Sequence, residues 1–266
     1  MADKFLEENI KLPELRADSP AELQTIYENW YVKNKDFVDG QIDKDVQLRK
    51  DDPNSTKIKE ALRLIWFGEH LTELCFPRMM NEERQMDLMV TLSDRRDIVG
   101  ASGPSNEHPA RWNIKMNKEE FLALDGSFNG DKSGFTFGGE AMARIILFGA
   151  HELAHQFNPP SDENEYDRVT ADVHKLDKER KELEFFSLVD PEAEKELVVL
   201  DKKIEEARIR VDALPDEYMA RTWEKRVANR FLGWSKAAMR FKKIYDRVTD
   251  YKKTQRGIKK PFLDRS

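Results

Sequence analysis

The pentapeptide His151-Glu152-Leu153-Ala154-His155 holds the residues of this chain that are best suited to chemistry. In a helix, positions i and i+4 lie on one face about one turn apart, so the imidazoles of His151 and His155 can reach a single metal ion. Glu152 can accept a proton from a water molecule that the ion activates. The spacing therefore predicts a zinc site with two histidine ligands and a glutamate general base.

The residues around this motif favour a buried helix. The segment 141–150 is apolar on nearly every side, as expected of a helix in the centre of a domain. Asn158-Pro159-Pro160 follows and should end the helix, because the residue before a proline disfavours helical geometry. The alternative is a chance match of a short pattern on an ordinary amphipathic helix whose histidines bind nothing.

Zinc held by two histidines needs a third protein ligand, and Glu217 is the first candidate. Ala220, one turn beyond Glu217, is small enough to let its helix approach the zinc helix closely. Glu224, two turns on and on the same face, is the rival ligand. The alternative without a metal is that Glu217 is an acid favoured by the dipole of a helix that begins at Pro215.

A block of ten residues resembles the glutamate helix of gluzincin metallopeptidases: Pro215-Asp216-Glu217-Tyr218-Met219-Ala220-Arg221-Thr222-Trp223-Glu224. In that helix, a Glu followed three residues later by a small residue is the third zinc ligand. Paired with HExxH, it is similar to a segment of phage- and plasmid-encoded peptidase-like domains and to the Glu-Phe-Phe-Ala pattern of the anthrax lethal factor group. The resemblance covers two short blocks of the chain. It implies a zincin fold and a Zn2+-dependent endopeptidase acting on a protein or peptide substrate, with His151, His155 and Glu217 as ligands.

Peptide hydrolysis at such a centre needs further side chains. An electrophilic group should stabilise the oxyanion of the tetrahedral intermediate. The candidates are Tyr218, Tyr166, His174 and His108. A carboxylate, from Glu224 or Asp216, should orient one of the histidine ligands.

The resemblance also implies a strand for binding substrate. In such folds the strand just ahead of the zinc helix is the sheet edge that pairs with an extended peptide, and the segment 112–117 is the candidate. Its candidate substrate-binding residues are Trp112, Asn113, Ile114 and Lys115. The alternative is a merely solvated strand with charged outward residues.

The composition is typical of a soluble intracellular protein. Of its 266 residues, 39% are hydrophobic, which is enough for a core, and 36% are charged. No apolar stretch approaches the length of a membrane span, and the polar N-terminus does not resemble a signal peptide. The single cysteine, Cys75, lies among apolar residues and cannot form an internal disulfide, which indicates a buried, inert thiol. We expect a cytoplasmic protein, or one delivered without a cleaved signal peptide.

Charge is distributed unevenly along the chain. Residues 225–266 hold 14 Lys and Arg against 3 Asp, whereas the preceding residues hold 31 Lys and Arg against 48 Asp and Glu. An apolar stripe at helical spacing runs through the basic segment, which favours docking on the rest of the protein or simple solvation over nucleic-acid binding. Nucleic acid is not the expected partner, because no nucleic-acid-binding motif accompanies the basic residues.

Hydrophobic periodicity predicts an α+β fold that is mostly α. Helices are expected from residue 20 and over 56–76, and strands over 86–92 and 111–117. The segment 100–105 is rich in Gly and Ser and contains a Pro, so it is expected to be a loop. A small mixed sheet should therefore precede the zinc helix.

The domain organisation follows from the same patterns. An N-terminal helical region, 1–80, is expected to pack on a zincin-like domain, 81–266. Within this domain, the segment 162–214 consists largely of charged helix formers with a break at Asp190-Pro191, which predicts an inserted helical hairpin that offers a surface for a protein partner. A basic helix over 225–256 should follow it.

Three functions are compatible with these features. A zinc-dependent endopeptidase accounts for the HExxH motif and the glutamate helix together. The first alternative is a zincin fold without catalytic activity, used as a binding or structural module. The second is a nucleic-acid-associated protein that uses the basic C-terminal helix. Cleavage that depends on Glu152, partner capture without new peptide ends, and binding that collapses with added salt would distinguish them.

Overall fold

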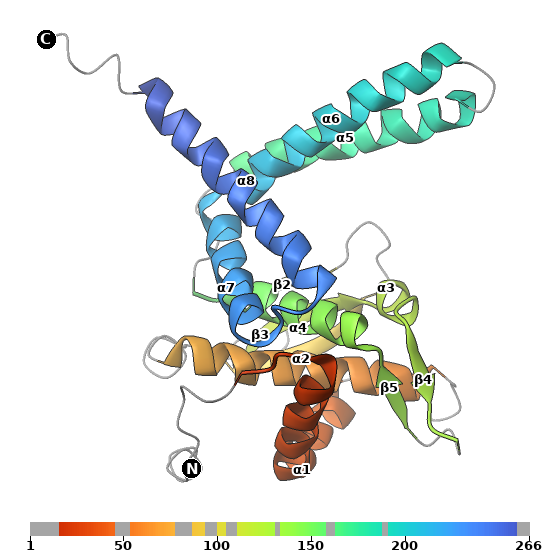
Figure 1. The fold of residues 1–266 in the computed structure, drawn as a ribbon, viewed down its shortest axis with the longest axis vertical. Helices are drawn as coiled ribbons and strands as arrows, with labels where there is room; N and C mark the ends of the chain where they lie inside the picture. The colour runs from red at the N-terminus through yellow and green to blue at the C-terminus, as the bar shows by residue number, and fades with distance from the viewer. Residues whose placement is uncertain are drawn as a thin grey trace, which may run out of the picture. The chain divides into compact units, whose positions relative to one another are not determined.

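Helices dominate the fold (Figure 1). The computed structural model describes residues 16–45, 54–77, 87–93, 100–104, 111–130, 134–157, 163–187 and 191–259. The elements are α1 (Pro20–Asp45), α2 (Ser55–Cys75), β1 (Asp87–Ser93), β2 (Gly100–Pro104), β3 (Arg111–Asn117), α3 (Lys118–Leu122), β4 (Gly126–Phe128), β5 (Phe135–Phe137), α4 (Gly139–Ala154), α5 (Glu163–Ser187), α6 (Pro191–Asp212), α7 (Pro215–Phe231) and α8 (Lys236–Lys259). The predicted class, α+β and mostly α, is confirmed.

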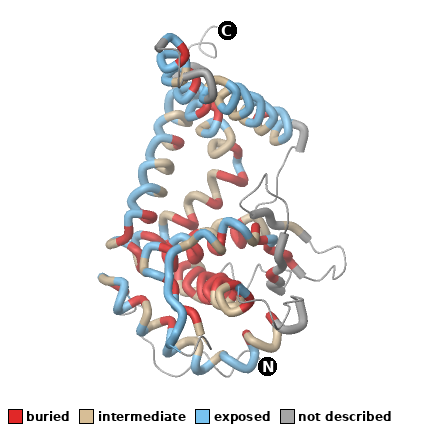
Figure 2. The backbone as a smooth tube through the Cα atoms, turned by 90° about the vertical axis from the view of Figure 1, so that its right-hand side faces the viewer, coloured by how far each residue is buried: buried red, intermediate tan, exposed pale blue. Residues whose placement is uncertain are grey.

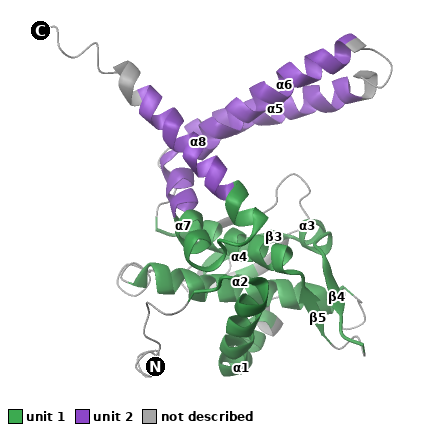
Figure 3. Ribbon diagram, viewed as in Figure 1, with its two compact units in different colours: residues 1–157, 223–240 green, residues 158–222, 241–266 purple. Residues whose placement is uncertain are grey.

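The chain divides into two compact units (Figure 3). The first consists of residues 1–157 and 223–240, and the second of residues 158–222 and 241–266. The division does not follow the boundary predicted at residue 80, because α1 and α2 belong to the same unit as the sheets and α4. The hairpin expected over 162–214 falls within the second unit.

A three-stranded mixed sheet in the order β1-β3-β2 lies in the first unit. β1 runs parallel to β3, and β2 runs antiparallel to it. The strand predictions for β1 and β3 are confirmed, but the loop predicted over 100–105 is wrong. Pairing with β3 imposes extended geometry on β2, and this tertiary contact outweighs the poor strand propensity of its Gly and Pro residues.

The position of β3 corrects a prediction about substrate binding. Residues 111–117 pair with β1 along one side, and residues 112–116 pair with β2 along the other. An extended peptide needs a strand with one unpaired backbone edge. β3 is the central strand, so the prediction that Trp112, Asn113, Ile114 and Lys115 form a substrate-binding edge is wrong.

Close contact between α2 and α4 fixes α4 in the core of the first unit (Figure 2). A Cβ atom added to Gly68 of α2 would lie 3.0 Å from the backbone oxygen of Ile146 in α4. One added to Gly149 of α4 would lie 3.3 Å from the backbone oxygen of Ile65 in α2. The two glycines therefore let the backbones of antiparallel helices touch, which no larger residue would permit without a shift.

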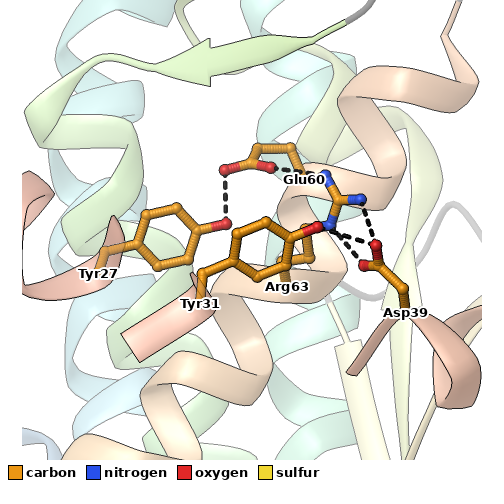
Figure 4. A network of polar contacts seen from close by, with 5 residues as sticks. All are labelled: Tyr27, Tyr31, Asp39, Glu60 and Arg63. Carbon is orange, nitrogen blue, oxygen red and sulfur yellow. Dashed lines mark hydrogen bonds and ion pairs between the residues drawn. The ribbon is translucent and has the colours of Figure 1, made fainter. Parts of the chain in front are cut away.

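A network of five polar side chains joins α1 to α2 (Figure 4). The Tyr27 hydroxyl donates to Glu60 at 2.7 Å, and the Tyr31 hydroxyl donates to Asp39 at 2.9 Å. The Arg63 guanidinium donates to both carboxylates, at 2.9 Å to Asp39 and 3.2 Å to Glu60. Burial raises the pKa of Glu60, although the hydrogen bonds from Tyr27 and Arg63 oppose the shift.

The second unit contains the predicted helical hairpin. Ion pairs cross from α5 to α6 in antiparallel order, Arg180 with Asp201 at 2.7 Å and Asp177 with Arg208 at 3.1 Å. The buried apolar residues of the hairpin are Val169, Ala193, Leu200, Ile204 and Ala207. α6 begins at Pro191, as the predicted break requires, whereas Asp190 lies outside the described residues.

The single basic helix predicted over 225–256 is wrong, because two helices occupy this range. α7 ends at Phe231 and α8 begins at Lys236. Ser235 caps α8 by accepting a hydrogen bond from the backbone of Ala238 at 2.9 Å. Glu140 in the first turn of α4 accepts from the backbone N–H of Lys236 at 2.9 Å, so the start of α8 is tied to α4.

Two expectations from the composition can be compared with the structure. Cys75 is buried, as predicted, and burial raises the pKa of its thiol against the charges of Arg230 and Arg226. Within the part of the chain that the structure describes, the helices are too polar or too short to traverse a lipid bilayer.

Candidate metal centre

The two histidines of the HExxH motif face each other at the end of α4. His151 lies in the last turn of the helix and His155 is its C-terminal cap residue. Their Nε2 atoms are 3.3 Å apart, and both residues are half-buried. The predicted helix thus places both imidazoles on one face, as the i, i+4 spacing requires.

The distance between these nitrogens is that of two ligands on one ion. Two nitrogens that each lie about 2.0–2.1 Å from a tetrahedral zinc are about 3.3 Å apart. The same distance would also suit a hydrogen bond between the rings if His155 carried its proton on Nε2. The position of a third donor is therefore needed to separate the two interpretations.

Glu217 is close enough to be that third donor. It lies in the first turn of α7 and is buried. One carboxylate oxygen of Glu217 and one ring nitrogen each of His151 and His155 lie within 4.8 Å of one another. These three residues are close enough to hold a metal ion.

Glu224, the rival ligand, occupies a different place around His151. Its Oε1 lies 3.3 Å from Nδ1 of His151, and only 3% of its side chain is exposed. A carboxylate beside Nδ1 favours the tautomer with the proton on Nδ1, which leaves the lone pair on Nε2, the atom that faces His155. Glu224 is therefore close enough to orient His151, the role that the sequence predicted for either Glu224 or Asp216.

Glu152, the expected general base, is buried next to the histidines in sequence. Its backbone carbonyl accepts a hydrogen bond from the indole N–H of Trp112 at 3.2 Å. Trp112 is itself buried in β3, so it ties the central strand to the last turn of α4. This contact gives Trp112 a structural role in place of the substrate contact predicted for it.

Trp223 anchors the part of α7 that carries Glu224. Its buried ring stacks on Phe76 at a centroid distance of 4.4 Å and packs against Phe157 at 5.1 Å. Arg230, further along α7, donates to the backbone oxygen of Leu74 at 2.7 Å. Sequence reasoning missed these anchors, although an aromatic residue directly before Glu224 was a signal for one.

The remaining candidates were predicted to stabilise the oxyanion or to orient a histidine, and these roles stay predictions. The Tyr218 hydroxyl lies 3.2 Å from the Tyr245 hydroxyl of α8, and its role in oxyanion stabilisation stays a prediction. His174 is exposed on α5, and Tyr166 is half-buried on the same helix. Asp216 is buried. His108 lies outside the described residues.

His70, a further histidine in the described part of the chain, belongs to a different environment. Its ring stacks on Trp30 at a centroid distance of 5.9 Å, and its Nδ1 lies 3.8 Å from a carboxylate oxygen of Glu73. These contacts are those of a packed histidine on the surface of α2 rather than of a metal ligand.

Comparison of the chain with known proteins gave no matching family model, no similar curated protein and no similar solved structure.

Proposed function

We propose that this protein is a zinc-dependent endopeptidase. One observation carries the proposal: the Nε2 atoms of His151 and His155 are separated by the distance expected for two ligands of a tetrahedral ion, and a carboxylate oxygen of Glu217 lies within 4.8 Å of a ring nitrogen of each histidine. The resemblance of the HExxH and glutamate-helix blocks to gluzincins supports the same assignment.

The donor set suits zinc. Two imidazoles and one carboxylate are the protein ligands of many catalytic zinc sites, in which the fourth position stays open for water or substrate. The buried carboxylate of Glu224, whose Oε1 lies 3.3 Å from Nδ1 of His151, occupies the place where metal-binding histidines usually have an outer carboxylate. A divalent cation would also offset the cost of burying the carboxylates of Glu217 and Glu224.

Hydrolysis would then divide between the ion and Glu152. When bound, zinc would supply a Lewis acid that polarises the peptide carbonyl and lowers the pKa of a water molecule to about 7. Glu152 would accept a proton from that water as its oxygen adds to the carbonyl carbon. The same carboxyl would then deliver the proton to the amine nitrogen as the C–N bond breaks, which returns Glu152 to its ionised form.

The sheet offers one edge next to α4 for an extended substrate. Among the strands that the structure describes, β2 is an outer strand that pairs with β3, and it packs against α4. We assign substrate pairing to the backbone of β2, because an outer strand has N–H and C=O groups to share with a peptide.

Replacement of the general base tests the proposal. Glu152→Gln keeps the size of the side chain but cannot accept a proton, so cleavage of a mixed peptide library should stop while zinc stays bound. Glu182→Gln, on the exposed surface of α5, is the matched control and should cleave as the wild type does. New peptide ends are detected by mass spectrometry.

Two results would count against the enzyme. Undiminished cleavage by Glu152→Gln would remove the general base from the mechanism. Zinc binding by a wild-type protein that produces no new peptide ends would favour the alternative of a binding or structural module.

A further inference from the structure

The third ligand lies at a weak point of its helix. α6 ends at Asp212, and α7 begins at Pro215 after a short turn. Glu217 lies two residues after Pro215, in the first turn of α7. The first turn of a helix lacks half of its backbone hydrogen bonds and frays readily. A metal ligand at such a position needs other contacts to hold it, and the inference below rests on the proposed function.

Tyr218, the neighbour of Glu217, is held by α8. Its ring stacks on that of Tyr245 at a centroid distance of 5.5 Å and an interplanar angle of 19°. Its hydroxyl lies 3.2 Å from the Tyr245 hydroxyl and 3.4 Å from Oγ1 of Thr249. One residue of the first turn of α7 is thus held through both its ring and its hydroxyl.

Lys252 of α8 holds the same turn from two directions. Its Nζ lies 4.4 Å from the centroid of the Tyr218 ring, within the range of a cation–π interaction. The same Nζ donates to the backbone oxygen of Ala213 at 3.0 Å. Ala213 follows the last residue of α6, so Lys252 satisfies a carbonyl at a helix C-terminus, where a cation is favoured.

An ion pair between Arg221 and Asp212 links α7 to the end of α6. Its guanidinium donates through two nitrogens to Oδ1 of Asp212, at 3.0 and 2.8 Å, and both side chains are more than four-fifths buried. The segment from Asp212 to Arg221 is therefore fixed at both ends, and α8 contacts it in the middle.

We propose that α8 positions the third metal ligand, with Lys252 and Tyr245 as positioning residues. Neither is itself assigned as a ligand; they act through Tyr218 and Ala213, which lie on either side of Pro215 and Glu217. Loss of these contacts lets the first turn of α7 fray, and the carboxylate of Glu217 then spends less time where a metal ion needs it.

Metal affinity measured separately from folding tests this role. Zn2+ affinity is determined by competition with a chelator, and the absorption spectrum of bound Co2+ reports the geometry of the ligands. Lys252→Met keeps the apolar stem of the side chain and should weaken Zn2+ binding on the order of tenfold, the scale of losses seen when outer contacts of a metal site are removed. The Co2+ spectrum should change as well.

Three further variants make the test specific. Lys252→Arg keeps a cation over the Tyr218 ring and a donor for Ala213, so it should recover most of the affinity. Lys243→Met removes an exposed cation from the same helix and should bind Zn2+ as the wild type does. Tyr245→Phe keeps the stacked ring but removes the hydroxyl contact, and it should show a smaller loss than Lys252→Met.

The variants distinguish a positioning role of α8 from a purely structural one. If Lys252→Met folds and binds Zn2+ with wild-type affinity, α8 has only a structural role and the inference is overturned. If Lys252→Met does not fold, unchanged affinity in Tyr245→Phe overturns the inference, and reduced affinity with an unchanged unfolding temperature supports it. A wild-type protein that binds neither ion overturns the proposed function, and this inference falls with it.

Discussion

The carboxylate of Glu224 lies 3.3 Å from Nδ1 of His151, while Nε2 of the same ring lies 3.3 Å from Nε2 of His155. A single imidazole therefore has a carboxylate near one nitrogen and a second imidazole near the other. This relationship assigns different roles to the two candidate glutamates of α7. We propose Glu217 as the ligand and Glu224 as the residue that sets the tautomer of His151.

Glutamine substitutions distinguish these two roles. Glu224→Gln keeps the size of the side chain beside Nδ1 of His151 but loses its charge, so Zn2+ affinity should fall by about ten- to a hundredfold with the stoichiometry unchanged. Glu217→Gln removes an anionic ligand and should cause a larger loss. Both affinities are measured by competition with a chelator. Equal losses in the two variants, or a larger loss in Glu224→Gln, would reverse the assignment.

Glycine-to-alanine substitutions test the contact that holds α4 against α2. Gly68→Ala would bring a Cβ to 3.0 Å from a backbone oxygen of Ile146, so one helix must move, and we expect a loss of about 1–3 kcal/mol in the free energy of unfolding. Gly149→Ala meets its backbone neighbour at 3.3 Å and should lose less. Denaturant unfolding monitored by circular dichroism provides the values.

Gly40→Ala is the matched control for these helices. Gly40 lies within α1, and no atom lies within 4 Å of a Cβ added there. Because alanine is the better helix former, this variant should gain about 0.5–1 kcal/mol. A Gly68→Ala variant as stable as Gly40→Ala would show that α2 and α4 are not in the close contact described.

The buried carboxyl of Glu60 should make stability depend on pH. Burial raises its pKa in the folded protein above the ordinary value of 4.5, so the folded state holds its proton more tightly than the unfolded state does. The contribution of Glu60 to the free energy of unfolding should therefore fall as the pH rises from 4.5 through the raised pKa.

Comparison with Glu60→Gln isolates this effect. The variant has no carboxyl to ionise, so its free energy of unfolding relative to that of the wild type should increase with pH across the same window. Denaturant unfolding at a series of pH values measures the difference. A difference that stays constant would mean that folding leaves the pKa of Glu60 unchanged, and one that decreases with pH would mean that the network around Arg63 stabilises its ionised form.

The capping of α8 by α4 predicts a smaller effect. The two carboxylate oxygens of Glu140 accept from the backbone N–H groups of Lys236, at 2.9 Å, and Ala237, at 3.1 Å. Glu140→Ala leaves these donors at the N-terminus of α8 to water and should cost about 1 kcal/mol of unfolding free energy. An exposed substitution of the same kind, Glu182→Ala on α5, should cost less, and equal unfolding midpoints for the two variants would argue against the cap.

The sequence alone predicted the structural features that depend on residues close together in the chain. The i, i+4 spacing of His151 and His155 needs only a helix, and the periodicity of 162–214 needs only a partner helix, so both could be inferred. The break between α7 and α8 also had a local signal, since Gly233 and Ser235 are typical of a helix end and a helix cap. That signal was outweighed by the apolar stripe that continues on both sides.

Features set by distant contacts could not be inferred. β2 is extended because β3 pairs with it, and strand order, which makes β3 central, leaves no mark in a single sequence. The choice between Glu217 and Glu224 likewise depends on where α7 lies beside His151. Both residues share a helix face, so only the contact itself separates them.

Zinc content is the most direct test of the central claim that His151, His155 and Glu217 hold one metal ion. Elemental analysis after dialysis against a weak chelator should find one zinc per chain in the wild type and in Glu152→Gln, and little in His155→Ala and Glu217→Gln. A wild-type protein without stoichiometric metal, or a His155→Ala variant that retains as much zinc as the wild type, would contradict the claim.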